Sequence, residues 1–220
     1  PKDIKDDYVK NRDKFCIELQ RKLIDGTYTS KKPENRLIEK KGKGDKNRNA
    51  KISAMEDRVV YTLILIVIEH KFRNKFIRNI YSGIEGRSLF SNNRKYCMIN
   101  QIRHWNITHP DMWVGMTDIS KFYESLEMKL VLGTLFKTIV CTYTRWLLVE
   151  SFKHFDKVPI GCSLSQLMAM ISIQDADIDV LKKFNVSLFC FGDNRLIGGE
   201  KAQVRKAIEY YMSYYEGAYN

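Results

Sequence analysis

The chain has 220 residues, 44% of them hydrophobic and 12% aromatic, which is enough to bury one core and excludes disorder as its main state. With 4 prolines and 12 glycines it is not fibrous, and no apolar run reaches the roughly 18 to 20 residues of a membrane span. The formal net charge of +11 predicts a partner of dense negative charge, first nucleic acid and then an anionic membrane surface.

The cysteine pattern and the first residues bear on the cellular compartment. Five cysteines are spread along the chain without a CxxC pair, so the sequence predicts neither a disulfide framework nor a zinc cluster. The first residues contain no apolar segment typical of a secretory signal. We therefore expect a protein of the reducing cytoplasm, with nucleic acid rather than a membrane as its partner. The cysteines are Cys16, Cys97, Cys141, Cys162 and Cys190.

The N-terminal half is predicted to contain helices and one basic segment. Apolar residues recur with helical spacing from residue 8 to residue 24. Residues 31–51 carry nine basic and three acidic side chains, with a turn at Lys41 to Asp45. This segment is either a solvated loop or a mobile β-hairpin that closes on phosphates. Residues 55–76 are apolar all round, and their length favours a central buried helix over a buried strand.

A glycine-containing polar stretch at residues 82–88 precedes a predicted helix at 94–105, and regular elements then alternate. Residues 112–118 are predicted to form a strand, residues 127–146 mostly helix, and residues 159–163 a turn. A helix at 164–184, a β-hairpin at 186–197 and a helix at 201–215 complete the series. This order predicts an α+β fold with a small antiparallel sheet.

Two carboxylates each follow a predicted strand. Asp118 ends the strand at 112–118, and Asp193 lies at the tip of the hairpin. Strand ends that meet at one edge of a sheet would form an oxygen-rich site for Mg²⁺, which prefers octahedral oxygen ligands. A pair of such ions about 3.5 to 4 Å apart aligns the attacking and leaving oxygens in phosphoryl transfer. Either acid alone is more typical of a turn, so the prediction depends on the whole set of motifs.

Three segments of the second half occur in an order that is specific when they are taken together: DISKFYESL (118–126), PIGCSLSQ (159–166) and FCFGDNRLIGG (189–199). Upstream lie GTY (26–28), the basic segment, AMEDRVVYTL (54–63) and SGIEGRSLF (82–90). The set resembles the palm and fingers motifs of prokaryotic reverse transcriptases, closest in style to those of diversity-generating retroelements and phage-defence systems. The resemblance implies a right-hand polymerase fold, with fingers at 1–110 and a palm at 111–220 that is cut off before its thumb.

The resemblance also implies the metal site. Asp118 and Asp193 match the ligands of Mg²⁺, or of Mn²⁺ in its place, and the Ile119 carbonyl adds a backbone oxygen. The family box YxDD reads FGDN here, so Asn194 takes a catalytic position with one negative charge fewer. Arg195 stands at a position that is usually apolar, and a cation beside the metals would oppose their binding. These changes predict weakened rather than abolished metal binding.

Further residues match contacts to the nucleotide and the template. Tyr123 matches the aromatic gate that excludes a 2′-hydroxyl, with a core position beside its neighbouring Phe122 as the alternative. Gly161 would permit close approach of the template-paired nucleotide. Ser165 and Gln166 would line the same groove. The basic residues matched to the incoming triphosphate are Arg48 and Lys51.

These roles together imply an RNA-directed DNA polymerase, a nucleotidyltransferase that adds deoxynucleotides by a two-Mg²⁺ mechanism. Its partners would be an RNA template, a DNA primer and deoxynucleoside triphosphates, and an accessory protein that supplies a missing surface stays open. The alternative is a catalytically impaired nucleic-acid-binding or interaction module derived from a polymerase. Template-independent DNA synthesis, or RNA synthesis on the same fold, is a third hypothesis.

Other chemistry is not predicted by the spacing of polar residues. An EF-hand loop from Asp175 would need glycine at its sixth position and glutamate at its twelfth, where Val180 and Val186 stand. Asp177 and Asp179 are instead expected on the surface of a helix. The four histidines show no metal-binding spacing.

Overall fold

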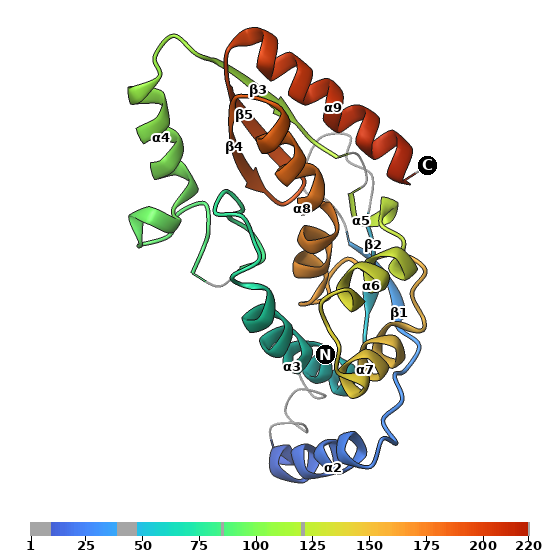
Figure 1. Cartoon of the computed structure of the whole chain (residues 1–220). Helices are drawn as coiled ribbons and strands as arrows, with labels where there is room; N and C mark the ends of the chain where they lie inside the picture. Colours follow the sequence, from blue (N-terminus) through green and yellow to red (C-terminus); the bar gives the residue numbers. More distant parts are fainter. Residues whose placement is uncertain (1–9, 39–47, 85, 120–121, 220) are drawn as a thin grey trace.

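The computed structural model describes residues 10–38, 48–84, 86–119 and 122–219, and it shows a mixed α+β fold in which small antiparallel sheets pack on helices (Figure 1). Among these residues, none of the helices is both long enough and apolar enough to cross a membrane. The elements in chain order are α2 (Arg12–Ile24), β1 (Glu34–Ile38), β2 (Arg48–Ile52), α3 (Met55–Phe72), the 3₁₀ helix η1 (Arg94–Tyr96), α4 (Met98–Thr108), β3 (Trp113–Thr117), α5 (Phe122–Ser125), α6 (Met128–Phe136), α7 (Thr142–Phe152), α8 (Ser165–Lys183), β4 (Val186–Phe191), β5 (Asn194–Gly199) and α9 (Lys201–Tyr219).

The basic segment forms the first sheet. Strands β1 and β2 pair antiparallel, with Glu34 opposite Ile52 and Leu37 opposite Asn49. A pair of strands, rather than a loop, is therefore the correct alternative for the residues that flank the centre of this segment. The predicted turn at Lys41 to Asp45 lies outside the described residues.

The second sheet has the order β3–β5–β4, and all of its pairings are antiparallel. Thr117 of β3 and Cys190 of β4 are both partners of Arg195 on the central strand. Asp118 follows β3 directly, and Asp193 lies in the turn that joins β4 to β5. The register therefore places both carboxylates at the same end of the sheet, as the sequence predicts.

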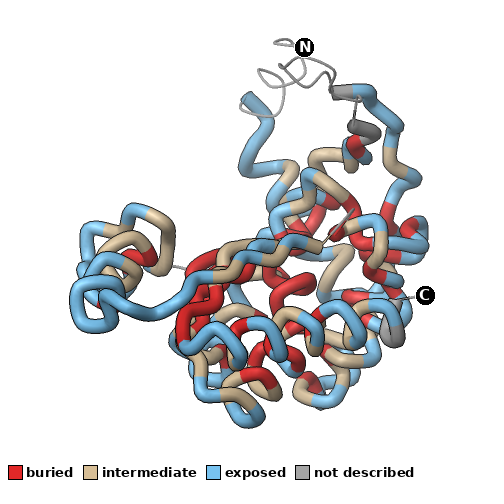
Figure 2. The backbone as a smooth tube through the Cα atoms, turned by 90° about the horizontal axis from the view of Figure 1, so that it is seen from above, coloured by how far each residue is buried: buried red, intermediate tan, exposed pale blue. Residues whose placement is uncertain are grey.

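Helices α8 and α9 cover one face of this sheet, and α4 lies against the other (Figure 1). Two glycines show the alternation, because a Cβ at Gly115 would meet α9 whereas one at Gly198 would meet Trp105 of α4. Figure 2 shows that the buried backbone is concentrated in one body, with α4 mainly exposed at its side. Helix α4, which the expected boundary at residue 110 assigns to the fingers, thus packs on the sheet of the expected palm.

Helix α3 confirms a helix for most of residues 55–76 and excludes a strand there. The expectation that it is buried on all sides is wrong. Val60, Ile64 and Ile68 lie in the core, whereas Ile66 and Val67 are 62% and 59% exposed. A run that is apolar all round carries no periodic signal, so the sequence cannot indicate which face of the helix packs.

Two of the other predicted helices are interrupted in the structure. The predicted helix at 94–105 consists of η1 and α4, separated at Cys97, and the helical region at 127–146 consists of α6 and the start of α7. Cys97 and Cys141 have extended backbone conformations and directly precede α4 and α7. Each helix therefore restarts after an extended residue, a change of direction that apolar spacing does not reveal.

The contact between β5 and α4 predicts the effect of a single methyl group. A Cβ at Gly198 would lie 2.4 Å from two ring carbons of Trp105. Gly198→Ala is therefore expected to lower the free energy of unfolding by about 1 to 3 kcal/mol, as overpacking does. Urea denaturation followed by circular dichroism measures this change.

Gly133 of α6 provides the matched control for this prediction. It is exposed, and a Cβ there would meet no atom within 4 Å. Gly133→Ala is expected to raise the free energy of unfolding by roughly 0.5 to 1 kcal/mol, because alanine loses less backbone entropy in a helix. Equal stability of Gly198→Ala and the wild type would contradict the described contact.

Candidate metal and nucleotide site

The side chains of Asp118 and Asp193 lie close enough for a hydrogen bond between their carboxyl groups. Asp118 is exposed, yet the remaining loss of hydration raises its pKa, and the negative charge of Asp193 raises it further. The backbone N–H of Ile119 opposes this shift by donating to the Asp118 carboxylate. Two like charges are thus held together at one end of the sheet, where a bound cation would relieve their repulsion.

Asn194 lies beside this pair at the exposed end of β5. Its Nδ2 donates to Oδ1 of Asp193 at 3.1 Å, so one oxygen of the predicted metal ligand already accepts a hydrogen bond from the side chain that replaces the second aspartate. Asn194 is therefore at the site, as expected, and acts there as a donor to Asp193. The amide lowers the local negative charge without removing Asp193 from the site.

Arg195 does not oppose metal binding in the expected way. Its side chain is fully buried on the opposite side of β5 from Asn194, and its Nε and Nη2 each donate to Asp177 at 3.0 Å. Burial alone would lower the pKa of Arg195, but the adjacent Asp177 carboxylate raises it, so the guanidinium stays charged and paired. The predicted repulsion is wrong because alternate residues of a strand face opposite sides.

Asp177 is a second departure from the predicted arrangement. It is expected on the surface of a helix, but it is fully buried on α8. Besides Arg195 it accepts a hydrogen bond from the Tyr211 hydroxyl of α9 at 2.7 Å. Because Arg195 is distant from it in sequence, no local pattern could reveal that this helical carboxylate has a buried partner.

Tyr123 is partly buried against the core and interacts electrostatically with Asp193, whereas its neighbour Phe122 belongs to the core. Phe122 is 4% exposed, and the two rings lie 5.1 Å apart between centroids. Partial burial raises the pKa of Tyr123, and the charge of Asp193 raises it further, which places the phenol within electrostatic range of that carboxylate. Tyr123 is therefore near Asp193, one of the two predicted metal ligands. The gate function itself remains a prediction.

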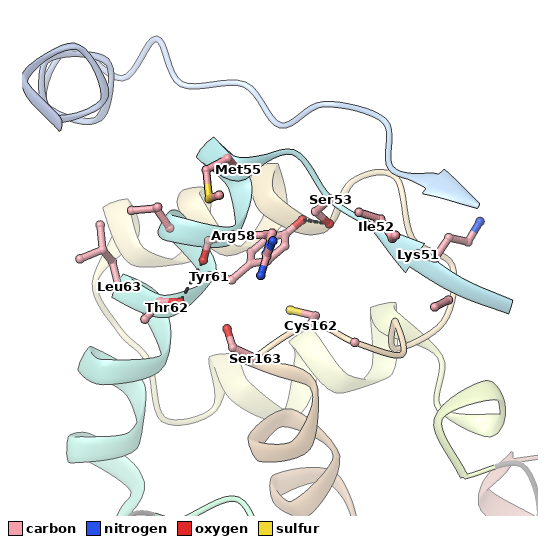
Figure 3. A pocket seen from close by; sticks show the side chains of 13 residues that line it. Lys51, Ile52, Ser53, Met55, Arg58, Tyr61, Thr62, Leu63, Cys162 and Ser163 are labelled. Atoms are coloured by element: carbon pink, nitrogen blue, oxygen red, sulfur yellow. Dashed lines mark hydrogen bonds between the residues drawn. The ribbon is translucent and has the colours of Figure 1, made fainter. Parts of the chain in front are cut away.

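A cavity of about 800 Å³ lies between β2, the first turns of α3 and the turn at residues 161–163 (Figure 3). Lys51 and Gly161 both line it, so the structure brings together two residues that the motifs predict on separate segments. Gly161 has φ +94°, a conformation that glycine adopts without strain. The side chain of Arg48 lies outside the described part of the chain.

Arg58 also lines this cavity and is not among the residues that the motifs predict. In Figure 3 the side chains of Arg58 and Tyr61 extend from α3 over the turn that carries Cys162 and Ser163. Arg58 is exposed and can present its guanidinium to an anion. Its place within AMEDRVVYTL, after two acidic residues, does not indicate on its own that Arg58 lines a cavity.

Ser165 does not line a groove as expected, whereas the predicted role of Gln166 stays a prediction. Ser165 is buried, and its hydroxyl donates to the carbonyl of Pro159, so it stabilises the turn from below instead of lining a groove. Gln166 is half-buried, and its Cγ would lie 3.2 Å from a Cβ added at Gly83. Both residues therefore support the segments around the site, because they begin α8 where that helix enters the core.

The donor set fits a magnesium or manganese ion that is shared with a substrate. Among the described residues there is no group of three or more His, Cys, Asp or Glu side chains that could hold a metal. Asp118 and Asp193 supply two carboxylates, and Mg²⁺ commonly completes its shell with water and substrate phosphates. The charge repulsion that raises the pKa of Asp118 would be removed by such an ion.

The carboxylate pair predicts a change in titration. Asp193→Asn removes the neighbouring charge and is expected to lower the pKa of Asp118, because the deprotonated form is no longer repelled. Two-dimensional NMR of the side-chain carboxyl carbons, recorded without divalent metal, measures this value. Asp175→Asn, which removes an exposed carboxylate from α8, is the control and leaves the Asp118 titration unchanged. An unchanged Asp118 pKa in Asp193→Asn would mean that the carboxyl groups are not in contact.

No family model matches the chain, and a search of curated proteins finds no match either. The candidate site consists of the carboxylate pair, the aromatic ring beside it and the cavity between β2 and α3.

Proposed function

We propose that this chain is the fingers and palm of a reverse transcriptase, an RNA-directed DNA polymerase. The observation that carries the proposal is the contact between Asp118 and Asp193, which a strand end and a hairpin turn bring to one end of the sheet. Tyr123 beside this pair and the cavity lined by Lys51 and Gly161 support it. Each feature lies on a segment whose sequence resembles the corresponding motif of that family.

The residues divide the work of nucleotide addition among them. Two Mg²⁺ ions, when bound, would activate the primer 3′-hydroxyl and stabilise the leaving pyrophosphate. Asp118 and Asp193 would hold these ions through carboxylate oxygens at the end of the sheet. The ring of Tyr123 packs under the sugar of the incoming nucleotide and leaves no room for a 2′-hydroxyl. Lys51 and Arg58 offer positive charge to phosphates in the cavity.

The charge distribution suits a polynucleotide partner. Lys31, Lys32, Arg36 and Lys51 are all exposed on or beside the sheet of β1 and β2, and the whole chain has a net charge of +11. Exposed lysines and arginines bind phosphates by releasing counterions, which makes such binding sensitive to salt. An RNA template and a DNA primer would therefore lie between this sheet and the carboxylate pair.

The proposal predicts metal-dependent primer extension. The chain, or a longer protein that contains it, is expected to extend a DNA primer on an RNA template with deoxynucleotides and Mg²⁺ or Mn²⁺. Asp118→Ala and Asp193→Ala are each expected to lower the rate more than about 100-fold, because metal binding supplies several kcal/mol of transition-state stabilisation. Asp175→Ala is the control for loss of an exposed carboxylate. Extension that survives both substitutions would exclude the proposed site.

A second candidate function is a polymerase-derived module that binds nucleic acid without catalysis. The hydrogen bond from Asn194 to Asp193 favours it, because the amide replaces a carboxylate and reduces the charge that attracts a metal. This candidate predicts RNA binding that weakens steeply with salt and no nucleotide incorporation. Any incorporation that depends on Asp118 would count against it.

The position of Tyr123 predicts sugar selectivity. Tyr123→Ala removes the ring beside Asp193 and is expected to reduce the preference for deoxynucleotides over ribonucleotides by roughly tenfold or more, since a steric clash is lost. Single-nucleotide incorporation with each triphosphate, with and without template, measures this preference and tests template-independent synthesis. Tyr96→Ala, on the partly exposed ring of η1, is the control. An unchanged preference would assign Tyr123 to packing alone.

A further inference from the structure

Both backbone polar groups of Gly192, the residue before Asp193, are held by side chains from other parts of the chain. Its N–H donates to Oγ of Ser82 at 2.6 Å, and its carbonyl accepts a hydrogen bond from Nη1 of Arg195. These two groups belong to the two peptide planes that meet at Gly192. The turn that carries Asp193 is thus held by two hydrogen bonds at the residue immediately before it.

These two hydrogen bonds matter because the backbone dihedrals of glycine are the least restricted of any residue. Gly192 has φ +62° in the left-handed region and no side chain to limit φ or ψ. When the planes on both sides of its Cα are held, the two dihedrals between them are determined as well. The direction in which the chain enters Asp193 then follows from Ser82 and Arg195 rather than from the turn alone.

The Arg195 side chain that donates to Gly192 is itself fixed by other hydrogen bonds. The other two guanidinium nitrogens, Nε and Nη2, each donate to one oxygen of Asp177 on α8, which also accepts a hydrogen bond from the Tyr211 hydroxyl of α9. Arg195, Asp177 and Tyr211 are all fully buried. The guanidinium is planar, so fixing two of its nitrogens on one carboxylate also fixes the direction of the third toward Gly192.

The Ser82 side chain that accepts from Gly192 belongs to a different segment. Ser82 is buried just after the stretch that pairs with β4, where the N–H of Tyr81 donates to the carbonyl of Cys190 at 2.9 Å. Its own hydroxyl proton is directed at the sulfur of Met170 on α8, at 3.5 Å. The oxygen is therefore oriented as an acceptor for the turn.

Stability alone does not account for this arrangement. A buried ion pair can usually be replaced by apolar residues of similar volume without loss of stability. The third hydrogen bond from the same guanidinium, to the turn before Asp193, fixes the conformation of that turn and buries no further apolar surface. We infer that Arg195 and Ser82 are positioning residues, which direct the carboxylate of Asp193 toward Asp118 so that both can bind the same metal.

The inference rests on the proposed function only for its role in catalysis, and its first test needs no catalysis. In the wild type the Gly192 amide is expected to be protected from hydrogen exchange, and Ser82→Ala is expected to remove this protection, as NMR measures. In Ser82→Ala, the affinity for Mn²⁺, measured by electron paramagnetic resonance, is expected to be weakened roughly tenfold, as is usual when a residue that supports a metal ligand is lost.

Ser172→Ala is the matched control for Ser82→Ala. Ser172 is a half-buried serine of α8 whose hydroxyl donates to the carbonyl of Met168 in its own helix. This variant is expected to keep the wild-type exchange of Gly192 and the wild-type Mn²⁺ affinity. An equal loss of affinity in both variants would indicate general loosening and would overturn the inference.

Arg195→Lys tests the hydrogen bond from Arg195 to the Gly192 carbonyl. Lysine keeps a positive charge beside Asp177 but cannot form the fork and reach Gly192 together. We expect weakened Mn²⁺ affinity and, where primer extension is measurable, a lower kcat with an unchanged KM for the nucleotide. If this variant does not fold, Ser82→Ala decides alone.

The outcomes separate the two proposals. Wild-type Mn²⁺ binding that is weakened by Ser82→Ala, in a protein without primer extension, would support the positioning role and contradict the polymerase. Unchanged exchange and affinity in Ser82→Ala, or a wild type that does not bind Mn²⁺, would overturn the positioning role.

Discussion

The arrangement of this protein depends most on holding two carboxylates of like charge together at one end of a small sheet. The pKa of Asp118 is raised first by loss of hydration and then by the charge of Asp193, so the proximity of the two carboxylates costs free energy when no cation is present. Antiparallel pairing of β3 with β5, and the turn between β4 and β5, impose that contact. Strain of this kind, held in place by the surrounding fold, is typical of functional sites.

The interior of the molecule supports this end of the sheet through one buried polar cluster. Arg195, Asp177 and Tyr211 connect the central strand to α8 and α9 without access to water. All of their described hydrogen bonds are charge-assisted, which makes them strong and directional in a medium of low dielectric constant. The same cluster reaches the backbone of Gly192 and thereby joins the core to the site. The same side chains therefore contribute to core packing and to the geometry of the turn that carries Asp193.

The cavity between β2 and α3 supplies what the carboxylates lack. It is lined by apolar groups and by two basic side chains, Lys51 and Arg58, and one wall is the turn that contains Gly161. Opposite charges thus occur on separate structural units, with the acidic pair on the sheet of β3, β4 and β5 and the basic residues around β2. A substrate whose phosphates bind the basic side chains and also share a metal ion with the carboxylates would interact with both. The proposed substrate, a nucleoside triphosphate, has that chemistry.

The sequence by itself determined the α+β class, the approximate bounds of most helices and strands, and the two acidic positions at strand ends, because these depend on local periodicity and turn chemistry. It also indicated that one of Phe122 and Tyr123 must face outward. Only the tertiary structure decided that Arg195 is paired with Asp177 rather than exposed to the metals, that Ser165 is buried, that α3 leaves Ile66 and Val67 in solvent, and that Arg58 lines the cavity. The physical reason is the same for each. Which side of an element is buried, and which distant residue a polar group meets, depends on packing between segments far apart in the chain, and no local pattern records it.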